Sequence, residues 1–286
     1  MEHVSRTPNR WLVVVGAIMI QLALGAIYAW SVFTRILTDP EGIYQFTATQ
    51  TAWIFSAGLA TFAAVMILAG RWLARVGPRR LTILGGLFLG LGFVLGGFFG
   101  GTFWAQFLFI GIVAGAGIGL GYVVPIAVGV KWFPDKKGMI TGLAVAGFGF
   151  GAMGWVKLAG NWGNLIESAG LASTFMIYGV AFAALVILGS FWMVMPPRGW
   201  QPAGYTPPVH KAGAGGEDFT QLEILRTPQF YMIFLTFAVS AGAGLMSIGL
   251  MKLYPIEALE AKLTEMEVEY QRVKVDVAGH SHMLDP

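Results

Sequence analysis

The chain has 286 residues, of which 56% are apolar and only 12% are charged, and its mean hydropathy is +0.68. Soluble domains carry roughly 25% charged residues, and disordered chains are poor in apolar and aromatic side chains, so the composition excludes both classes. The absence of Cys excludes a disulfide framework and a thiolate zinc site. The net charge is only +3, and the basic residues lie in short clusters between apolar runs rather than on one face, so the charge gives no indication of a nucleic-acid-binding surface.

Long apolar runs divide the chain into candidate membrane spans. A bilayer core needs about 20 apolar residues of helix, and runs of about that length cover residues 11–36, 51–69, 81–100, 103–130, 138–157, 171–195 and 230–250. The sequence therefore predicts an all-α membrane protein in which a six-helix bundle is followed by a seventh transmembrane helix.

The connection after the sixth run differs from the others, because it is long and rich in proline and glycine, which is typical of a linker. We therefore predict an N-terminal six-helix bundle over residues 1–195, a cytoplasmic linker over 196–228, a seventh transmembrane helix over 229–251 and an extracytoplasmic tail over 252–286.

Lys and Arg are distributed unequally between the two sides of the predicted bundle. Alternate connections contain clusters of basic residues, whereas the short connections on the opposite side contain only Arg35 and Lys157. Since Lys and Arg accumulate in cytoplasmic loops, we expect a multi-pass protein of the plasma (inner) membrane whose N-terminus faces the cytoplasm.

Two short strings suggest an internal repeat of three spans. Residues 24–28 are similar to residues 118–122, and residues 58–60 to residues 142–144. Three spans repeated with opposite topology are typical of transporters. The matches are short, so chance similarity stays open as the alternative.

The connection between the second and third spans reads GRWLARVGPRR from residue 70 to residue 80. It resembles the signature loop of the major facilitator superfamily, in which basic residues surround a turn glycine. The matching residues are Gly70, Arg75, Gly77, Arg79 and Arg80, and the resemblance implies a gating role for them. Ala74 stands where the family usually has Asp, so the family's charged latch is not expected here.

Two further strings are similar to the oxalate/formate antiporter family. They are LGAIYAWSVF at residues 24–33 in the first span and GLAVAGFG at residues 142–149 in the fifth. The resemblance covers about residues 8–259 and implies transport of small organic anions by alternating access. The family's cationic substrate residues lie on the eighth and eleventh helices. The resemblance therefore implies an incomplete or split transporter, in which a second half-transporter or a homodimer partner supplies these residues or the given sequence lacks them.

Within the spans, Tyr28, Tyr122 and Trp30 are candidates for an aromatic cage whose polar groups hydrogen-bond a carboxylate. An aromatic belt at the membrane surface is the alternative. Gln21 and Gln106 are further candidates for substrate binding, although uncharged polar groups within spans more often bond neighbouring helices.

Beyond residue 255 the apolar residues follow a heptad spacing, with charged residues on the other faces. This pattern predicts an amphipathic helix outside the membrane, which favours a second interpretation of the protein as a non-transporting scaffold subunit that recruits a partner. No cofactor or metal site is expected, because His280 and His282 are interpreted as a solvated terminal pair. No span combines a nucleophile with a base or pairs two carboxylates, so an enzyme is not expected.

Overall fold

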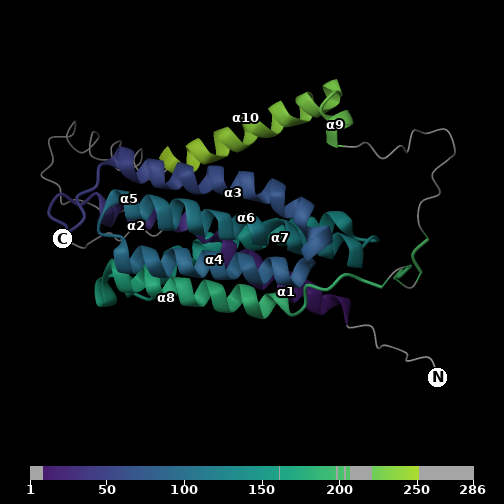
Figure 1. Cartoon of the computed structure of the whole chain (residues 1–286), viewed down its shortest axis with the longest axis horizontal. Coiled ribbons are helices and arrows are strands. Elements are labelled where there is room, and N and C mark those ends of the chain that lie inside the picture. Colours follow the sequence, from purple (N-terminus) through teal and green to yellow (C-terminus); the bar gives the residue numbers. More distant parts are fainter. Residues whose placement is uncertain (1–8, 161, 198, 203, 207–220, 251–286) are drawn as a thin grey trace, which may run out of the picture. The chain divides into compact units, whose positions relative to one another are not determined.

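The computed structural model describes residues 9–160, 162–197, 199–202, 204–206 and 221–250. The chain divides into two compact units, Met1–Tyr205 and Thr206–Pro286, which we describe separately. All regular elements in the described ranges are helices (Figure 1).

Six helical spans of the first unit are long and apolar enough to cross a membrane. The first span consists of α1 (Arg10–Leu24), the 3₁₀ segment η1 (Gly25–Ala29) and α2 (Trp30–Leu37). It is followed by α3 (Ala48–Val76) and α4 (Pro78–Phe99), then by a fourth span made of α5 (Phe103–Gln106), the π-helical η2 (Phe107–Ala114) and α6 (Gly115–Trp132), and finally by α7 (Lys137–Ala159) and α8 (Leu165–Ser190). The prediction of an all-α, multi-pass membrane protein is confirmed.

Local signals set the ends of α3, which is longer than the predicted second span. At its start, Thr47 and Gln50 form a capping box in which each side chain accepts a hydrogen bond from the other residue's backbone N–H, at 3.2 and 2.9 Å. At its end, Gly77 adopts φ +87°, a conformation that side chains with a Cβ rarely tolerate, and Pro78 starts α4 directly afterwards. The connection between α3 and α4 is thus the single residue Gly77.

The packing of the spans follows the suggested three-span repeat. The fourth span corresponds to the first, α7 corresponds to α3, and α8 corresponds to α4. Accordingly, α3 packs on α6, and its counterpart α7 packs on α1 and η1. Likewise, α4 packs on α6, and its counterpart α8 packs on α1. The corresponding helices α4 and α8 also pack extensively against each other (Figure 1).

Glycine allows the closest of these contacts. A Cβ on Gly90 of α4 would lie 2.8 Å from the carbonyl oxygen of Gly179 in α8, and a Cβ on Gly179 would lie 2.6 Å from the carbonyl oxygen of Gly90. In lipid, where no hydrophobic force drives helices together, such backbone contacts supply the packing energy. The α4–α8 pair is therefore closely packed. Helix α4 also contacts α6, and α8 also contacts α1.

The chain after α8 packs against the bundle as far as Tyr205. The indole Nε1 of Trp132, at the end of α6, donates a hydrogen bond of 2.6 Å to the carbonyl of Val194, and the rings of Trp132 and Trp200 lie 4.8 Å apart. Met193 is fully buried. The first residues of the predicted linker, up to Tyr205, therefore belong to the same compact unit as the six spans.

The second unit contains α9 (Gln221–Ile224) and α10 (Pro228–Leu250). Helix α10 coincides with the run that predicts a seventh transmembrane helix. The predicted amphipathic helix of the tail lies outside the described residues.

Candidate substrate site

Four aromatic rings from four different helical elements form a cluster that we call the four-ring cluster. Its members are Tyr28 of η1, Phe62 of α3, Tyr122 of α6 and Phe148 of α7. The ring centroid of Phe148 lies 5.5 Å from that of Tyr28, 5.2 Å from that of Tyr122 and 6.4 Å from that of Phe62, and Phe62 lies 5.2 Å from Tyr122. The cluster thus brings together the two predicted tyrosines.

The repeat explains why the two tyrosines meet. Tyr28 and Tyr122 are 94 residues apart, which is the offset between the first and fourth spans, so they occupy corresponding positions. Both are half-buried, and both meet the Phe148 ring nearly perpendicularly, at 88° and 83°. Edge-to-face contacts are a favoured arrangement of aromatic rings.

Close backbone packing beside the cluster places Tyr28 against α7. A Cβ on Gly25, at the start of η1, would overlap the carbonyl oxygen of Phe148. Because only glycine permits this approach, the first span reaches the α7 backbone here, and Tyr28 follows about one turn later against the Phe148 ring.

Gln21 lies two turns before Tyr28, against the same part of α7. Its side chain is fully buried, and the nearest atom to a Cβ built on Gly147 would be the Gln21 Cβ, at 3.3 Å. Neither Nε2 nor Oε1 of Gln21 has a hydrogen-bond partner in the described part of the chain. A buried amide without partners is costly, which makes Gln21 the most unusual polar side chain in the described spans.

Trp30 and Gln106 lie in other surroundings. The Nε1 of Trp30 donates to the carbonyl of Thr51 at 3.1 Å, and its ring contacts Phe33. The Nε2 of Gln106 donates to the carbonyls of Gly96 and Gly100, both at 3.2 Å, so this amide bonds the fourth span to the end of α4. These contacts favour packing roles for both residues.

The predicted gating loop is tied to the end of α8. A guanidinium nitrogen of Arg79 donates to the carbonyl of Phe191, and the guanidinium carbon lies 5.5 Å from the Phe191 ring centroid. Arg75 and Arg80 are exposed, and Gly70 is exposed with no atom within 4 Å of a built Cβ. The site of Ala74, where the family usually has Asp, is also exposed.

Sequence reasoning missed Phe62 and Phe148. Phe148 lies between Gly147 and Gly149 within the string that resembles the oxalate/formate antiporter family. A bulky ring between two glycines was the available signal. Phe62 carries no comparable signal, since α3 is rich in apolar residues throughout.

The four-ring cluster and the nearby Gln21 provide hydrogen-bond donors but no ionised side chain. The phenol hydroxyls of the two tyrosines and the amide of Gln21 can donate to a carboxylate, and the edges of aromatic rings carry partial positive charge. No group of three or more His, Asp or Glu side chains that could hold a metal ion occurs among the described residues. The groups named here that can hydrogen-bond a ligand are therefore neutral.

Comparisons with known proteins give a consistent result. The family model of the Major Facilitator Superfamily matches residues 10–266. The uncharacterized MFS-type transporter YhjX of Escherichia coli is 32% identical over 85% of this chain and 57% of its own length. The oxalate:formate antiporter of Oxalobacter formigenes is 27% identical over 80% of this chain and 51% of its own length.

Monocarboxylate transporter 14 of Homo sapiens is 24% identical over 65% of this chain and 36% of its own length. The chain thus spans about half the length, or less, of these curated relatives. The match of the family model over most of the chain agrees with the packing of the six spans and with the signature loop. The chain belongs to the major facilitator superfamily.

Proposed function

We propose that the chain takes part in the transport of small organic anions, such as oxalate, formate or another mono- or dicarboxylate, by alternating access. The observation that carries this proposal is the meeting of Tyr28 and Tyr122 on the Phe148 ring, at corresponding positions of the repeat. The names of two relatives, an oxalate:formate antiporter and a monocarboxylate transporter, support the choice of substrate class.

In this proposal Tyr28, Tyr122 and Gln21 act as neutral donors to the carboxylate oxygens. A hydrogen bond to a charged acceptor contributes about 1.5–3 kcal/mol, which orients the anion without holding it too tightly to be released. Trp30 and Gln106 then act indirectly, by packing the spans, and the loop with Gly70, Arg75, Gly77, Arg79 and Arg80 takes part in gating.

A partner supplies the positive charge in this proposal, either a second half-transporter or a second copy of the chain. Support comes from α3 and α7, which are the least buried of the six spans and correspond to each other in the repeat. Exposed glycines such as Gly149 and Gly154 on α7 leave that helix smooth enough for close contact with another helix.

The distribution of Lys and Arg supports a location in the plasma (inner) membrane, with the N-terminus in the cytoplasm and α10 as a seventh span. The proposed activity is transport and involves no chemical conversion of the substrate.

Equilibrium binding of radiolabelled oxalate and formate to the chain in lipid nanodiscs tests the proposal. We expect saturable binding to the wild type, and about tenfold weaker binding to Tyr28→Phe and to Tyr122→Phe, which corresponds to the loss of about 1.4 kcal/mol each. The matched control is Tyr178→Phe, since the Tyr178 hydroxyl donates to the carbonyl of Trp155, outside the cluster. Unchanged affinity in both cluster variants would contradict the proposal.

Proteoliposomes containing this chain alone should show no saturable exchange of oxalate for formate until a partner is supplied. The alternative function, a scaffold subunit that recruits a partner, predicts a different result. The chain would then bind no carboxylate and would copurify with another protein at fixed stoichiometry.

A further inference from the structure

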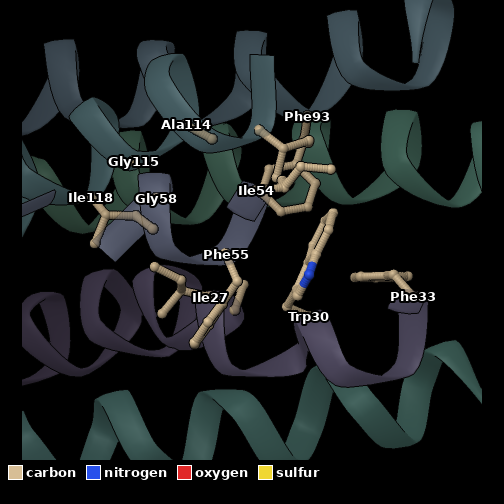
Figure 2. A pocket seen from close by; sticks show the side chains of 12 residues that line it. Ile27, Trp30, Phe33, Ile54, Phe55, Gly58, Phe93, Ala114, Gly115 and Ile118 are labelled. Atoms are coloured by element: carbon tan, nitrogen blue, oxygen red, sulfur yellow. The ribbon is translucent and has the colours of Figure 1, made fainter. Parts of the chain in front are cut away.

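A small apolar cavity lies beside η1 (Figure 2). It has a volume of about 20 Å³ and is lined by residues from η1, α2, α3, α4, η2 and α6. Ala26 and Ile27 contribute from η1, and Gly58 of α3 and Ile118 of α6 are among the residues that surround them. The lining offers no polar side chain except Trp30, whose Nε1 already bonds Thr51. A cavity of this kind has room for about one water molecule and stays dry when its walls are apolar.

The segment beside this cavity is wound differently from the rest of its span. Residues Gly25–Ala29 form a 3₁₀ helix between α1 and α2. Hydrogen bonds of 3₁₀ helices have poorer geometry than those of α-helices, and a 3₁₀ stretch within a longer helix often marks a hinge. Tyr28 and Ile27 are consecutive residues of this segment, and they face different surroundings. Tyr28 contacts Phe148, whereas Ile27 lines the cavity.

We propose that Gly58 is a positioning residue for Tyr28, because its missing side chain leaves the space into which Ile27 moves when η1 changes its winding. A 3₁₀ helix rises about 2.0 Å per residue and an α-helix 1.5 Å. Tyr28 is the fourth residue of η1, so rewinding the segment as an α-helix shifts Tyr28 by up to about 2 Å along the span. Such a shift is of the size needed to bring the phenol hydroxyl onto a ligand or to withdraw it.

Gly58→Ala tests this role without an expected clash. A Cβ on Gly58 would lie 3.8 Å from both the Ile27 Cδ1 and the Gly111 carbonyl oxygen, which is ordinary contact. The added methyl group fits the observed structure and occupies space that Ile27 needs in order to move. Gly58→Ala should therefore fold normally and hold η1 in its present winding.

The repeat provides a matched control, Gly142→Ala. Gly142 of α7 is the counterpart of Gly58 in the repeat, is exposed and has no atom within 4 Å of a built Cβ. Both variants gain the same helix propensity, but only Gly58→Ala reduces the space beside Ile27. Ile118→Val is the opposite variant, because it enlarges the cavity.

Hydrogen exchange of backbone amides in nanodiscs measures the winding of η1 directly. In the wild type we expect residues 25–30 to exchange faster than residues 13–20 of the same span. Gly58→Ala should slow exchange at residues 25–30 by about tenfold, Ile118→Val should speed it, and Gly142→Ala should leave it unchanged. Equal exchange along the span in the wild type, or the same response to both glycine variants, would overturn the proposal.

Oxalate binding forms the second part of the test and rests on the proposed function. Gly58→Ala should change the affinity for oxalate by at least about threefold, while Gly142→Ala should leave it unchanged. An altered exchange rate in Gly58→Ala with unchanged affinity would overturn the positioning role. Failure of every form to bind oxalate would overturn the proposed function instead, and the exchange rates would still report whether Gly58 controls the winding of η1.

Discussion

Tyr28 and Tyr122, which are 94 residues apart in the chain, meet edge-on at the single ring of Phe148, with centroid distances of 5.5 and 5.2 Å. Each tyrosine comes from the corresponding helix of one three-span repeat, so the two repeats converge on a side chain that belongs to only one of them. The two tyrosine hydroxyls of the cluster therefore come from corresponding positions of the two repeats, whereas the Phe148 ring that both tyrosines contact comes from the second repeat alone.

Phe148→Leu should weaken this arrangement while keeping an apolar side chain in place. The variant loses three ring contacts, each contributing roughly 0.5–1.5 kcal/mol beyond burial, so we expect a loss of about 1.5–4.5 kcal/mol in stability and weaker oxalate binding. Thermal unfolding in detergent and equilibrium binding measure the two effects. Phe150→Leu on the same helix is the control, since Phe150 is 61% exposed and its replacement should change neither quantity.

The two buried glutamines should respond to the same replacement with opposite signs. Gln21→Met removes an amide that has no partner in the described spans, so we expect the unfolding free energy to rise by about 1–3 kcal/mol. Gln106→Met breaks two hydrogen bonds to the end of α4 and should lower it by about 1–3 kcal/mol.

Thermal unfolding compares these two variants directly. In the proposed role of Gln21 as a donor to the substrate, Gln21→Met also binds oxalate more weakly although it is more stable. A destabilised Gln21→Met protein would mean that the amide has a partner in the membrane that the described residues do not supply.

Trp132→Phe should loosen the chain that follows α8. The variant keeps an aromatic ring next to Trp200 but cannot donate to the Val194 carbonyl, a bond worth about 1 kcal/mol net. We expect the backbone amides of residues 192–195 to exchange hydrogen about fivefold faster, while those of α4 stay unchanged. Trp104→Phe is the control, because Trp104 is 73% exposed. Unchanged exchange at residues 192–195 would show that ring packing alone holds this segment.

Much of the fold could be predicted from the sequence because membrane helices are encoded locally. Apolar runs bounded by charge identified the six spans to within a few residues at most ends, and Gly77-Pro78 identified the turn between α3 and α4. The ends that differ most are those of α3 and α8. Helix α3 runs on to Val76 and stops only at Gly77, and α8 begins at Leu165, ahead of the non-helical Gly170, and ends at Ser190.

The candidate site was predictable only in part. Tyr28 and Tyr122 could be identified because they occur in recognisable strings of corresponding spans, whereas Phe148 and Phe62 could be found only once α7 and α3 were placed beside them. Trp30 and Gln106 resembled site residues in the sequence because polar and aromatic groups in spans are uncommon. The structure shows their carbonyl partners, which the sequence does not indicate. Trp30 bonds the carbonyl of Thr51, and Gln106 bonds those of Gly96 and Gly100.

The sequence by itself determined that this chain is a bundle of apolar helices and which of its loops carry the basic residues. These properties follow from hydropathy and helix-breaking residues, which act over one or two turns. Only the tertiary structure decided that Gln21 is buried without a partner, that η1 is wound as a 3₁₀ helix beside a cavity, and that both tyrosines share Phe148. Those features depend on how closely separate helices approach, and that distance is set by glycines whose contacts lie far away in the chain.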